Sequence, residues 1–362
     1  MSRLNYVLAL TYVCFACRPT EGFTSLYRQA ASTRQTVWNA PVEADKNQLT
    51  PEYYSTRGGS LNAWPLSRDP KGMSPDYPLA AARIGITIAS TYLTWYAQGQ
   101  YSNVMASSAF ALICSMLFDR RLGQAAFCGS FAGMCSTAIV PTTGLALQLG
   151  VLTAIFFEII IHYWNAFLGI GGRLGMTAFL ATSVIAAQSG VSTGIQASAM
   201  TINSLTKTSL CIMALWHAIG AVATIALREA SDESSAADPV RASAVIGLAG
   251  GLLLKDKTAA LALYGGSFVG MSLPSRLLQG ILPKKGTSPR HFTVASILSA
   301  FAAAGALGGL VHGITLDWNM WPGGWGGKAG SCAFVGCLLF RLLSKTISTV
   351  RQFIRPSKVN LN

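Results

Sequence analysis

Charged residues are what this chain most lacks. Only 11% of its 362 residues are Asp, Glu, Lys or Arg, whereas 51% are hydrophobic. A soluble domain usually carries about 25% charged residues, which it needs to keep its surface wetted. The shortage excludes an ordinary soluble domain. Together with a mean hydropathy of +0.42, it predicts an integral membrane protein whose first partner is the lipid bilayer.

Acidic residues are scarcer than basic ones, with 14 Asp and Glu against 27 Lys and Arg. A nucleic-acid partner would require the basic residues to gather on one soluble face with aromatic platforms. Here they are scattered between apolar runs, which predicts no nucleic-acid binding. The net charge of +13 favours loops that face an anionic membrane surface.

Motifs for catalysis are also lacking. The chain has no GxSxG, no HExxH and no nucleotide-binding loop. Cys14 and Cys17 lie in the leading apolar run, the other six cysteines lie inside later apolar segments, and no pair has the spacing of a zinc site. We therefore expect no cofactor, no metal, no disulfide and no enzyme, although catalysis by Glu158 and the histidines stays open as an alternative.

The main feature that is present is an internal repeat. Residues 129–134, GSFAGM, return 137 residues later as GSFVGM at 266–271. A second block, Trp164-Asn165 followed by GGRLG at 171–175, returns as Trp318-Asn319 and GGKAG at 326–330. The second copy is therefore slightly longer than the first. Repeats of this length indicate one structural unit that is used twice.

Ten apolar runs are candidates for membrane spans, which need about 20 residues each. They are 79–97, 103–118, 123–140, 143–163 and 171–190 in a first unit (79–192), and 207–227, 240–254, 258–281, 292–314 and 325–343 in a second unit (207–345). A basic tail follows at 346–362. The predicted fold is all-α, a polytopic membrane bundle of about ten helices in two five-helix repeats.

An odd number of spans per unit inverts the second copy in the membrane. With ten spans, most loop Lys and Arg fall on the side that also holds both termini, as the positive-inside rule requires. The inversion depends on the two short runs, 103–118 and 240–254, crossing fully. If one did not cross, the two units would run parallel.

The N-terminus has the composition of a targeting sequence. A basic start and an apolar run to Cys17 predict a signal peptide over residues 1–22. Residues 23–41 hold no acidic residue but several Ser, Thr and Arg, and they begin a transit-like stretch and polar linker that extends to residue 78. This order, with Phe23 at the junction, resembles the bipartite plastid-targeting presequence of algae with secondary plastids. The resemblance implies a plastid membrane, either envelope or thylakoid. The alternative is an ordinary signal peptide and a secretory-pathway membrane.

Four glycines begin small-xxx-small patterns at duplicated positions: Gly129, Gly266, Gly171 and Gly326. Small residues four apart let two helix backbones approach closely, so the simplest interpretation is helix packing. The functional alternative is that these glycines, with the neighbouring Ser130 and Ser267, line a narrow path at the repeat interface.

Ionisable residues occupy matching places in the two units. Arg173 and Lys328 each follow a glycine pair at the start of a predicted helix, where the free N–H groups also favour an anion. Glu158 and His312 each lie six residues before the Trp-Asn pair, inside an apolar run, and we expect them to form a proton-sensitive pair. The alternatives are that Arg173 and Lys328 are membrane-edge anchors, and that Glu158 pairs with a nearby cation.

The layout is similar to that of urea transporters and other five-plus-five carriers, in architecture only. It predicts a transporter or channel with its path at the repeat interface, and the two basic residues favour a small anion. Such a path requires a polar cavity between the units that residues of both the GGR and GGK blocks touch. The alternative is a structural or assembly protein of a plastid membrane that uses its GxxxG faces to hold partners or a second copy of itself. That alternative predicts a dry interface with outward-facing glycines.

Overall fold

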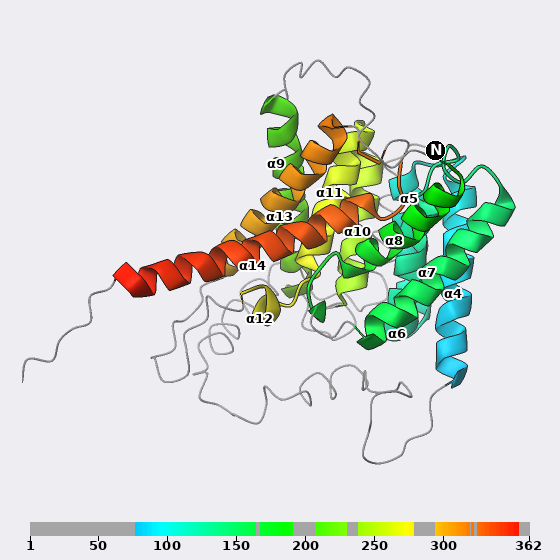
Figure 1. Ribbon diagram of the computed structural model, residues 1–362, viewed down its shortest axis with the longest axis horizontal. Helices are drawn as coiled ribbons and strands as arrows, with labels where there is room; N and C mark the ends of the chain where they lie inside the picture. The colour runs from blue at the N-terminus through cyan, green and yellow to red at the C-terminus, as the bar shows by residue number, and fades with distance from the viewer. Residues whose placement is uncertain are drawn as a thin grey trace, which may run out of the picture. The chain divides into compact units, whose positions relative to one another are not determined.

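The protein is described by a computed structural model over residues 77–163, 167–190, 207–229, 238–278, 294–318, 320–321 and 324–354. The predicted signal peptide, and the transit-like stretch up to residue 76, lie outside this part of the chain. Within it the fold is all-α, with eleven helices and no strand. They are α4 (Tyr77–Ala97), α5 (Asn103–Leu117), α6 (Arg120–Gly133), α7 (Thr143–Tyr163), α8 (Arg173–Gln188), α9 (Lys207–Glu229), α10 (Pro239–Leu253), α11 (Lys257–Gly270), α12 (Pro274–Leu277), α13 (Val294–Asp317) and α14 (Lys328–Ile354) (Figure 1).

Each predicted span contains a helix, but two of these helices, α6 and α11, end well before the apolar run does. α6 ends at Gly133 and α11 at Gly270, whereas the apolar runs continue to residues 140 and 281. Fourteen helical residues extend about 21 Å, which is less than a hydrocarbon core of about 30 Å. After each helix the backbone bonds to the other half of the molecule instead. Ser136 N donates to Gly324 O at 2.9 Å, and Leu273 N donates to Gly169 O at 2.8 Å.

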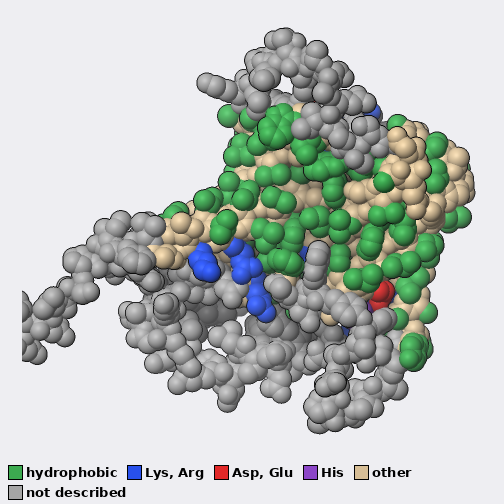
Figure 2. Space-filling model, in the orientation of Figure 1, with side chains coloured by type: hydrophobic (Ala, Val, Ile, Leu, Met, Phe, Trp, Pro, Cys, Tyr) green, Lys and Arg blue, Asp and Glu red, His purple; other side chains and the backbone are tan. Residues whose placement is uncertain are grey.

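Four helical segments are long and apolar enough to cross a membrane: Thr143–His162, Leu210–Glu229, Val294–Leu316 and Lys328–Thr349. α5 and α10 are shorter apolar helices. Large apolar side chains are exposed on most of these helices, for example Leu117, Leu215 and Leu342. Figure 2 shows such side chains over much of the described surface in that view, with Lys and Arg gathered near the C-terminal half of α14. A surface of this kind suits lipid better than water.

The helices fall into two sets with the same internal contacts. We call α4–α8 the first unit and α9–α14 the second unit. α4 packs on α6 and α7, as α9 packs on α11 and α13. α5 packs on α6 and α8 on α7, as α10 packs on α11 and α14 on α13. We call residues of the two units matched where the repeat alignment or these equivalent contacts pair them.

Helix starts are built alike in both units. The side chain of Asp119 caps α6 by accepting a hydrogen bond from Leu122 N, and matched Asp256 caps α11 by accepting from Thr258 N. Asp119 and Asp256 are therefore helix N-caps, whose carboxylates satisfy N–H groups that the helix leaves free.

Helix ends are also matched. Gln98 Nε2 donates to Cys135 O at 2.6 Å just after α6, and Arg228 Nη1 donates to Ser272 O at 2.9 Å just after α11. Each side chain satisfies a carbonyl that the preceding helix leaves without a partner. The carbonyl after the short helix thus accepts a hydrogen bond from an amide in the first unit and from a guanidinium in the second.

Between the units, matched helices face each other. α5 packs on α10 and α8 packs on α14. The backbones of α8 and α14 meet at Gly175 and Gly330, where a Cβ on either glycine would overlap the Cα of the other. Four aromatic rings fill the neighbouring core: Phe127, Phe131, Tyr264 and Phe268. The core of the described region therefore extends across the contact between the units.

Candidate functional site

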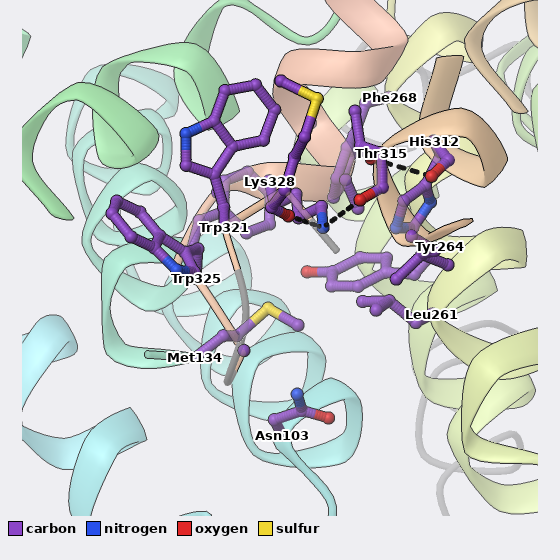
Figure 3. Close-up of a pocket in the computed structure, with 17 residues that line it drawn as sticks. Asn103, Met134, Leu261, Tyr264, Phe268, His312, Thr315, Trp321, Trp325 and Lys328 are labelled. Carbon is purple, nitrogen blue, oxygen red and sulfur yellow. Dashed lines mark hydrogen bonds between the residues drawn. The ribbon is translucent and has the colours of Figure 1, made fainter. Parts of the chain in front are cut away.

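A pocket of about 170 Å³ lies where the two units meet. Its walls come mainly from the second unit, through α11, α13, α14 and the turns before α14. The first unit contributes Asn103, Phe131 and Met134. In Figure 3, Trp321 and Trp325 lie on one side of the pocket and His312 on the other, with Tyr264 beneath. A space of this size holds a few waters or one small solute, since drug-sized ligands usually need about 300 Å³ or more.

Lys328 is the charged group of the pocket. It is the first residue of α14, and its ammonium points inward from a residue that is only 9% exposed (Figure 3). Nζ donates to the carbonyls of Met320 at 2.7 Å and Thr315 at 3.5 Å, both at the C-terminal end of α13 or just beyond it. Two acceptors leave one of its three N–H donors for a ligand.

The surroundings of Lys328 favour an anion. Among the carboxylates whose side chains the structure describes, none pairs with it. Ala329 and Gly330 also line the pocket, and they belong to the first turn of α14, whose N–H groups have no partner within the helix. A helix N-terminus carries partial positive charge, so it adds to the ammonium. The chemistry of the pocket therefore suits a small anion.

Arg173, which matches Lys328, does not line this pocket. It is the first residue of α8 and is partly buried. The glycine before it, Gly172, has a positive φ of 82° and lies so close to α14 that a Cβ there would overlap the backbone of Gly330 and Phe334. The expectation that both basic blocks touch one cavity is thus wrong for this pocket, because the GGR block is packed directly against the other unit.

His312 lies at the inner end of the pocket and is fully buried. Its Nδ1 lies 3.0 Å from Nε2 of His217 on α9, which is also fully buried. The two rings meet edge to face at 78°. Among the described residues, the other two ring nitrogens, Nδ1 of His217 and Nε2 of His312, have no hydrogen-bond partner.

Glu158 belongs to a different cluster. Arg83 Nε and Nη2 donate to its two carboxylate oxygens at 2.7 Å each, and His162 Nε2 lies 3.1 Å from Oε2. Glu158 therefore pairs with a nearby cation, which was the simpler interpretation of the sequence. The expected pairing of Glu158 with His312 is wrong, because each side chain has other partners.

Helix packing explains that error. Gly150 of α7 rests on Ile88 of α4, and Gly305 of α13 rests on Ala218 of α9. These contacts match α7 to α13 with a shift of 155 residues, from 150 to 305, rather than the 154 given by the Trp-Asn pairs. Phe157 is then the residue matched to His312. A shift of one residue turns a helical position by about 100°, which moves it to another face.

The remaining sequence candidates hold helices together. Ser130 Oγ lies 3.0 Å from Ser107 Oγ, and Ser267 Oγ lies 2.6 Å from Ser243 Oγ. All four are buried, and none of them lines the pocket. Each pair joins the two short helices of one unit, α5 to α6 and α10 to α11.

The four candidate glycines make close backbone contacts. A Cβ on Gly129 would overlap α4, and one on Gly266 would overlap α9. Gly171 and Gly326 precede α8 and α14, and each approaches backbone carbonyls at the end of the other unit's short helix, α11 or α6. The glycines thus face inward, which disagrees with the outward-facing glycines expected of a scaffold.

The sequence did not predict two polar contacts near the site. One joins His217 to His312, and the other joins Tyr264 to Ser107. His217 lies inside the apolar run 207–227, and no pattern in the sequence assigned it a partner. Tyr264 stands where the first unit has Phe127, and its hydroxyl lies 3.3 Å from Ser107 Oγ. A search for polar residues at positions that are apolar in the other repeat would have found Tyr264, but not His217, whose matched residue Thr87 is also polar.

No family model, curated protein or solved structure matches this chain. Function therefore has to be argued from the site itself.

Proposed function

We propose that this protein is a membrane transporter or channel in which a small anion passes through the pocket beside Lys328, at the interface of the two units. One observation carries the proposal. The ammonium of Lys328 is buried in a largely apolar pocket without a described carboxylate partner, and it lies at the N-terminal end of α14. A buried charge of this kind is costly unless something neutralises it, and within a span it marks a functional position.

The proposal includes an inverted repeat. It is supported by the direction of the matched helices where they touch. Along α5 and α10, Met105 lies against Gly251, whereas Arg241 Nη2 donates to Ser115 O at 2.6 Å. Early residues of one helix thus meet late residues of the other, so the pair is antiparallel.

The same holds for α8 and α14, where Gly172 approaches Phe334 and Phe179 approaches Gly327. Matched helices that are antiparallel are related by a rotation of about 180° around an axis perpendicular to both. If these helices cross the bilayer, that axis lies in the membrane plane. Inverted repeats of this kind commonly bind solutes at their interface, where helices begin or end within the membrane.

The short helices fit this proposal. α6 and α11 end within the protein and are followed by irregular backbone that bonds to the opposite unit. Irregular backbone at membrane depth is tolerated where protein or a water-filled cavity surrounds it. Met134, the residue directly after α6, lines the pocket, so one of these breaks lies next to the proposed anion site.

For localisation, we propose a plastid membrane, either envelope or thylakoid. The support is the composition of residues 1–41, where an apolar run precedes an acid-poor stretch rich in Ser, Thr and Arg. N-terminal sequencing of the mature protein tests this proposal. A mature chain that begins at Met1 would contradict it.

The anion path is tested by flux into vesicles that contain the purified protein, measured per correctly inserted molecule. Loss of a charged hydrogen bond costs about 1.5–3 kcal/mol, so Lys328→Gln should lower the flux of a small anion by about ten-fold or more. Lys328→Arg keeps the charge and should retain most of the flux. Arg173→Gln is the matched control in the first unit, and we expect it to change flux less than about two-fold, because Arg173 does not line the pocket.

A second variant tests the pocket rather than the charge. Ala329→Leu introduces the residue that the first unit has at the matched position, Leu174, and its side chain would fill part of the cavity. We expect lower flux with unchanged insertion. If Lys328→Gln and Ala329→Leu both carry wild-type flux, the pocket is not a path. That outcome would overturn the proposed anion path.

A further inference from the structure

The buried pair His217–His312 adds a second polar element to the pocket. Neutral imidazole has one N–H and one lone pair, so a single hydrogen bond between two rings leaves one outer nitrogen protonated and the other bare. Neither outer nitrogen has a partner among the described residues. Nδ1 of His312 faces His217, which does not line the pocket, so Nε2 is the nitrogen of His312 that remains for the pocket. Buried polar atoms without partners are rare and call for an explanation.

The second unit makes room for this pair, and the first unit does not contain it. A Cβ on Gly265 would lie 2.7 Å from Cε1 of His217, so only glycine leaves space for that ring. The first unit has Cys128 at the matched position and Thr87 in place of His217. Phe157 stands in place of His312 and packs in an apolar cluster with Cys128. A buried histidine pair at these positions therefore occurs only in the second unit, which supplies most of the pocket.

We propose that the His217–His312 pair is a proton-binding site coupled to the anion site at Lys328, so that the pocket takes up a small anion together with one proton. This inference rests on the proposed function. In the tautomer where His312 Nδ1–H donates to His217 Nε2, the Nε2 of His312 carries a lone pair. A proton that binds there breaks no bond and adds one positive charge. The shared proton can shift between Nδ1 and Nε2, so either ring can hold that charge.

The coupling follows from charge. Lys328 lines the same pocket as His312, and Nζ of Lys328 contacts the carbonyl of Thr315, whose hydroxyl donates to His312 O at 2.7 Å. Two positive charges that line one largely apolar pocket repel each other. An anion at Lys328 removes most of that repulsion, so it favours a proton on the pair. By linkage, the proton favours the anion equally.

Other titratable groups near the pair do not change the direction of this coupling, in which anion binding favours proton binding. α11 contributes Tyr264, and α14 contributes Lys328 and Cys332. Tyr and Cys are ordinarily neutral near pH 7, which leaves Lys328 as the fixed charge beside the pair among the side chains that the structure describes. Asp317, which ends α13, is the acidic residue nearest in sequence. The variant Asp317→Asn therefore belongs in the test, to separate its charge from that of the anion.

The first experiment measures binding by the intact, purified protein in weakly buffered detergent, with chloride and nitrate as probes. Hydrochloric and nitric acids are fully ionised in water, so any protons taken up from the solution must bind to the protein and not to the anion. We expect wild type and Asp317→Asn to take up protons when they bind either anion in mildly acidic solution. His162→Gln, a control in the first unit, should do the same. His312→Gln should bind the anion but take up at least ten-fold fewer protons. Anion binding without proton uptake in wild type would overturn the coupling and leave the anion site intact.

The second experiment uses vesicles with a pH indicator inside and an inward chloride gradient. Wild type should acidify the interior as chloride enters, whereas His312→Gln should admit chloride without acidification. Gly265→Cys, which crowds His217 without removing a histidine, should behave like His312→Gln. Equal acidification in wild type and both variants would overturn the role of the pair. If wild type neither binds nor admits either anion, the proposed function fails, and this inference fails with it.

Discussion

The two units share one backbone plan but differ in how they neutralise buried polarity. The first unit buries an ion pair, in which Arg83 holds Glu158 with both oxygens bonded. At the matched positions the second unit has Met213 and Gly313, and Gly313 lies against Met213. The second unit instead buries His217 and His312, where the first has Thr87 and Phe157. Each unit therefore buries ionisable side chains between one pair of helices, α4 and α7 in the first unit and α9 and α13 in the second, at positions that are not matched.

The difference decides where a cavity forms. In the first unit Phe157 and Leu174 pack with Cys128 and close the space. In the second unit His312 and Ala329 occupy the matched positions and line the pocket. A smaller residue and a polar ring thus leave open in one unit what two apolar side chains fill in the other. The two units thus share their helix contacts and differ in a few buried residues.

The largest effect should come from breaking the ion pair of the first unit. Arg83→Met introduces the residue of the second unit and leaves the Glu158 carboxylate buried beside His162. Removal of one partner of a buried pair typically costs about 3–5 kcal/mol, because the remaining charge is uncompensated. We expect a loss of this size in the free energy of unfolding, measured by denaturant titration of the protein in detergent.

The double variant Arg83→Met, Glu158→Ala removes both charges and tests this reason. It should recover more than half of the stability that Arg83→Met loses. If the double variant is less stable than Arg83→Met, the cost lies in packing rather than in charge.

A smaller effect is expected at the contact between the units. Gly172→Ala combines a positive φ of 82° with a Cβ that would overlap the backbone of α14. The left-handed conformation costs about 1–2 kcal/mol, and overpacking adds about 1–3 kcal/mol. Gly190→Ala is the control for backbone strain alone, because Gly190 has a φ of 68° and a Cβ there meets nothing within 4 Å.

Thermal unfolding of both variants measures the difference. Gly172→Ala should lower the unfolding temperature clearly more than Gly190→Ala does. Equal losses would mean that α8 and α14 can separate without cost, which would contradict a tight interface between the units.

The smallest effect concerns the matched helix ends. Gln98→Ala removes one hydrogen bond to Cys135 O and should cost about 1 kcal/mol. Arg228→Gln introduces the amide side chain that the first unit has at the matched position, Gln98, and keeps a donor for Ser272 O. It should cost less than Gln98→Ala in the same denaturant titration. A larger loss would show that the second bond of Arg228, to Gly270 O, carries the stability.

Several features of the fold could be read directly from the sequence. Apolar runs separated by polar turns predicted the all-α fold, because burial in a bilayer or core requires continuous apolar residues. Four of the helices are long and apolar enough to cross a membrane. The recurrence of GSFAGM predicted the matched helices α6 and α11. The glycines before Arg173 and Lys328 indicated the starts of α8 and α14.

The sequence alone also determined that two blocks of residues recur, that charged residues are scarce and that Arg173 and Lys328 each follow a glycine pair, because these properties depend only on residue order. Only the tertiary structure decided which basic residue lines a pocket and which histidines pair. His217 and His312 are 95 residues apart, and their contact depends on the way α9 and α13 pack. A shift of one residue in that packing would replace His312 by a neighbour on another face of the helix. Sequence spacing fixes position along a helix, but the register between helices comes from the close contacts of glycines such as Gly305 and Gly309 with α9.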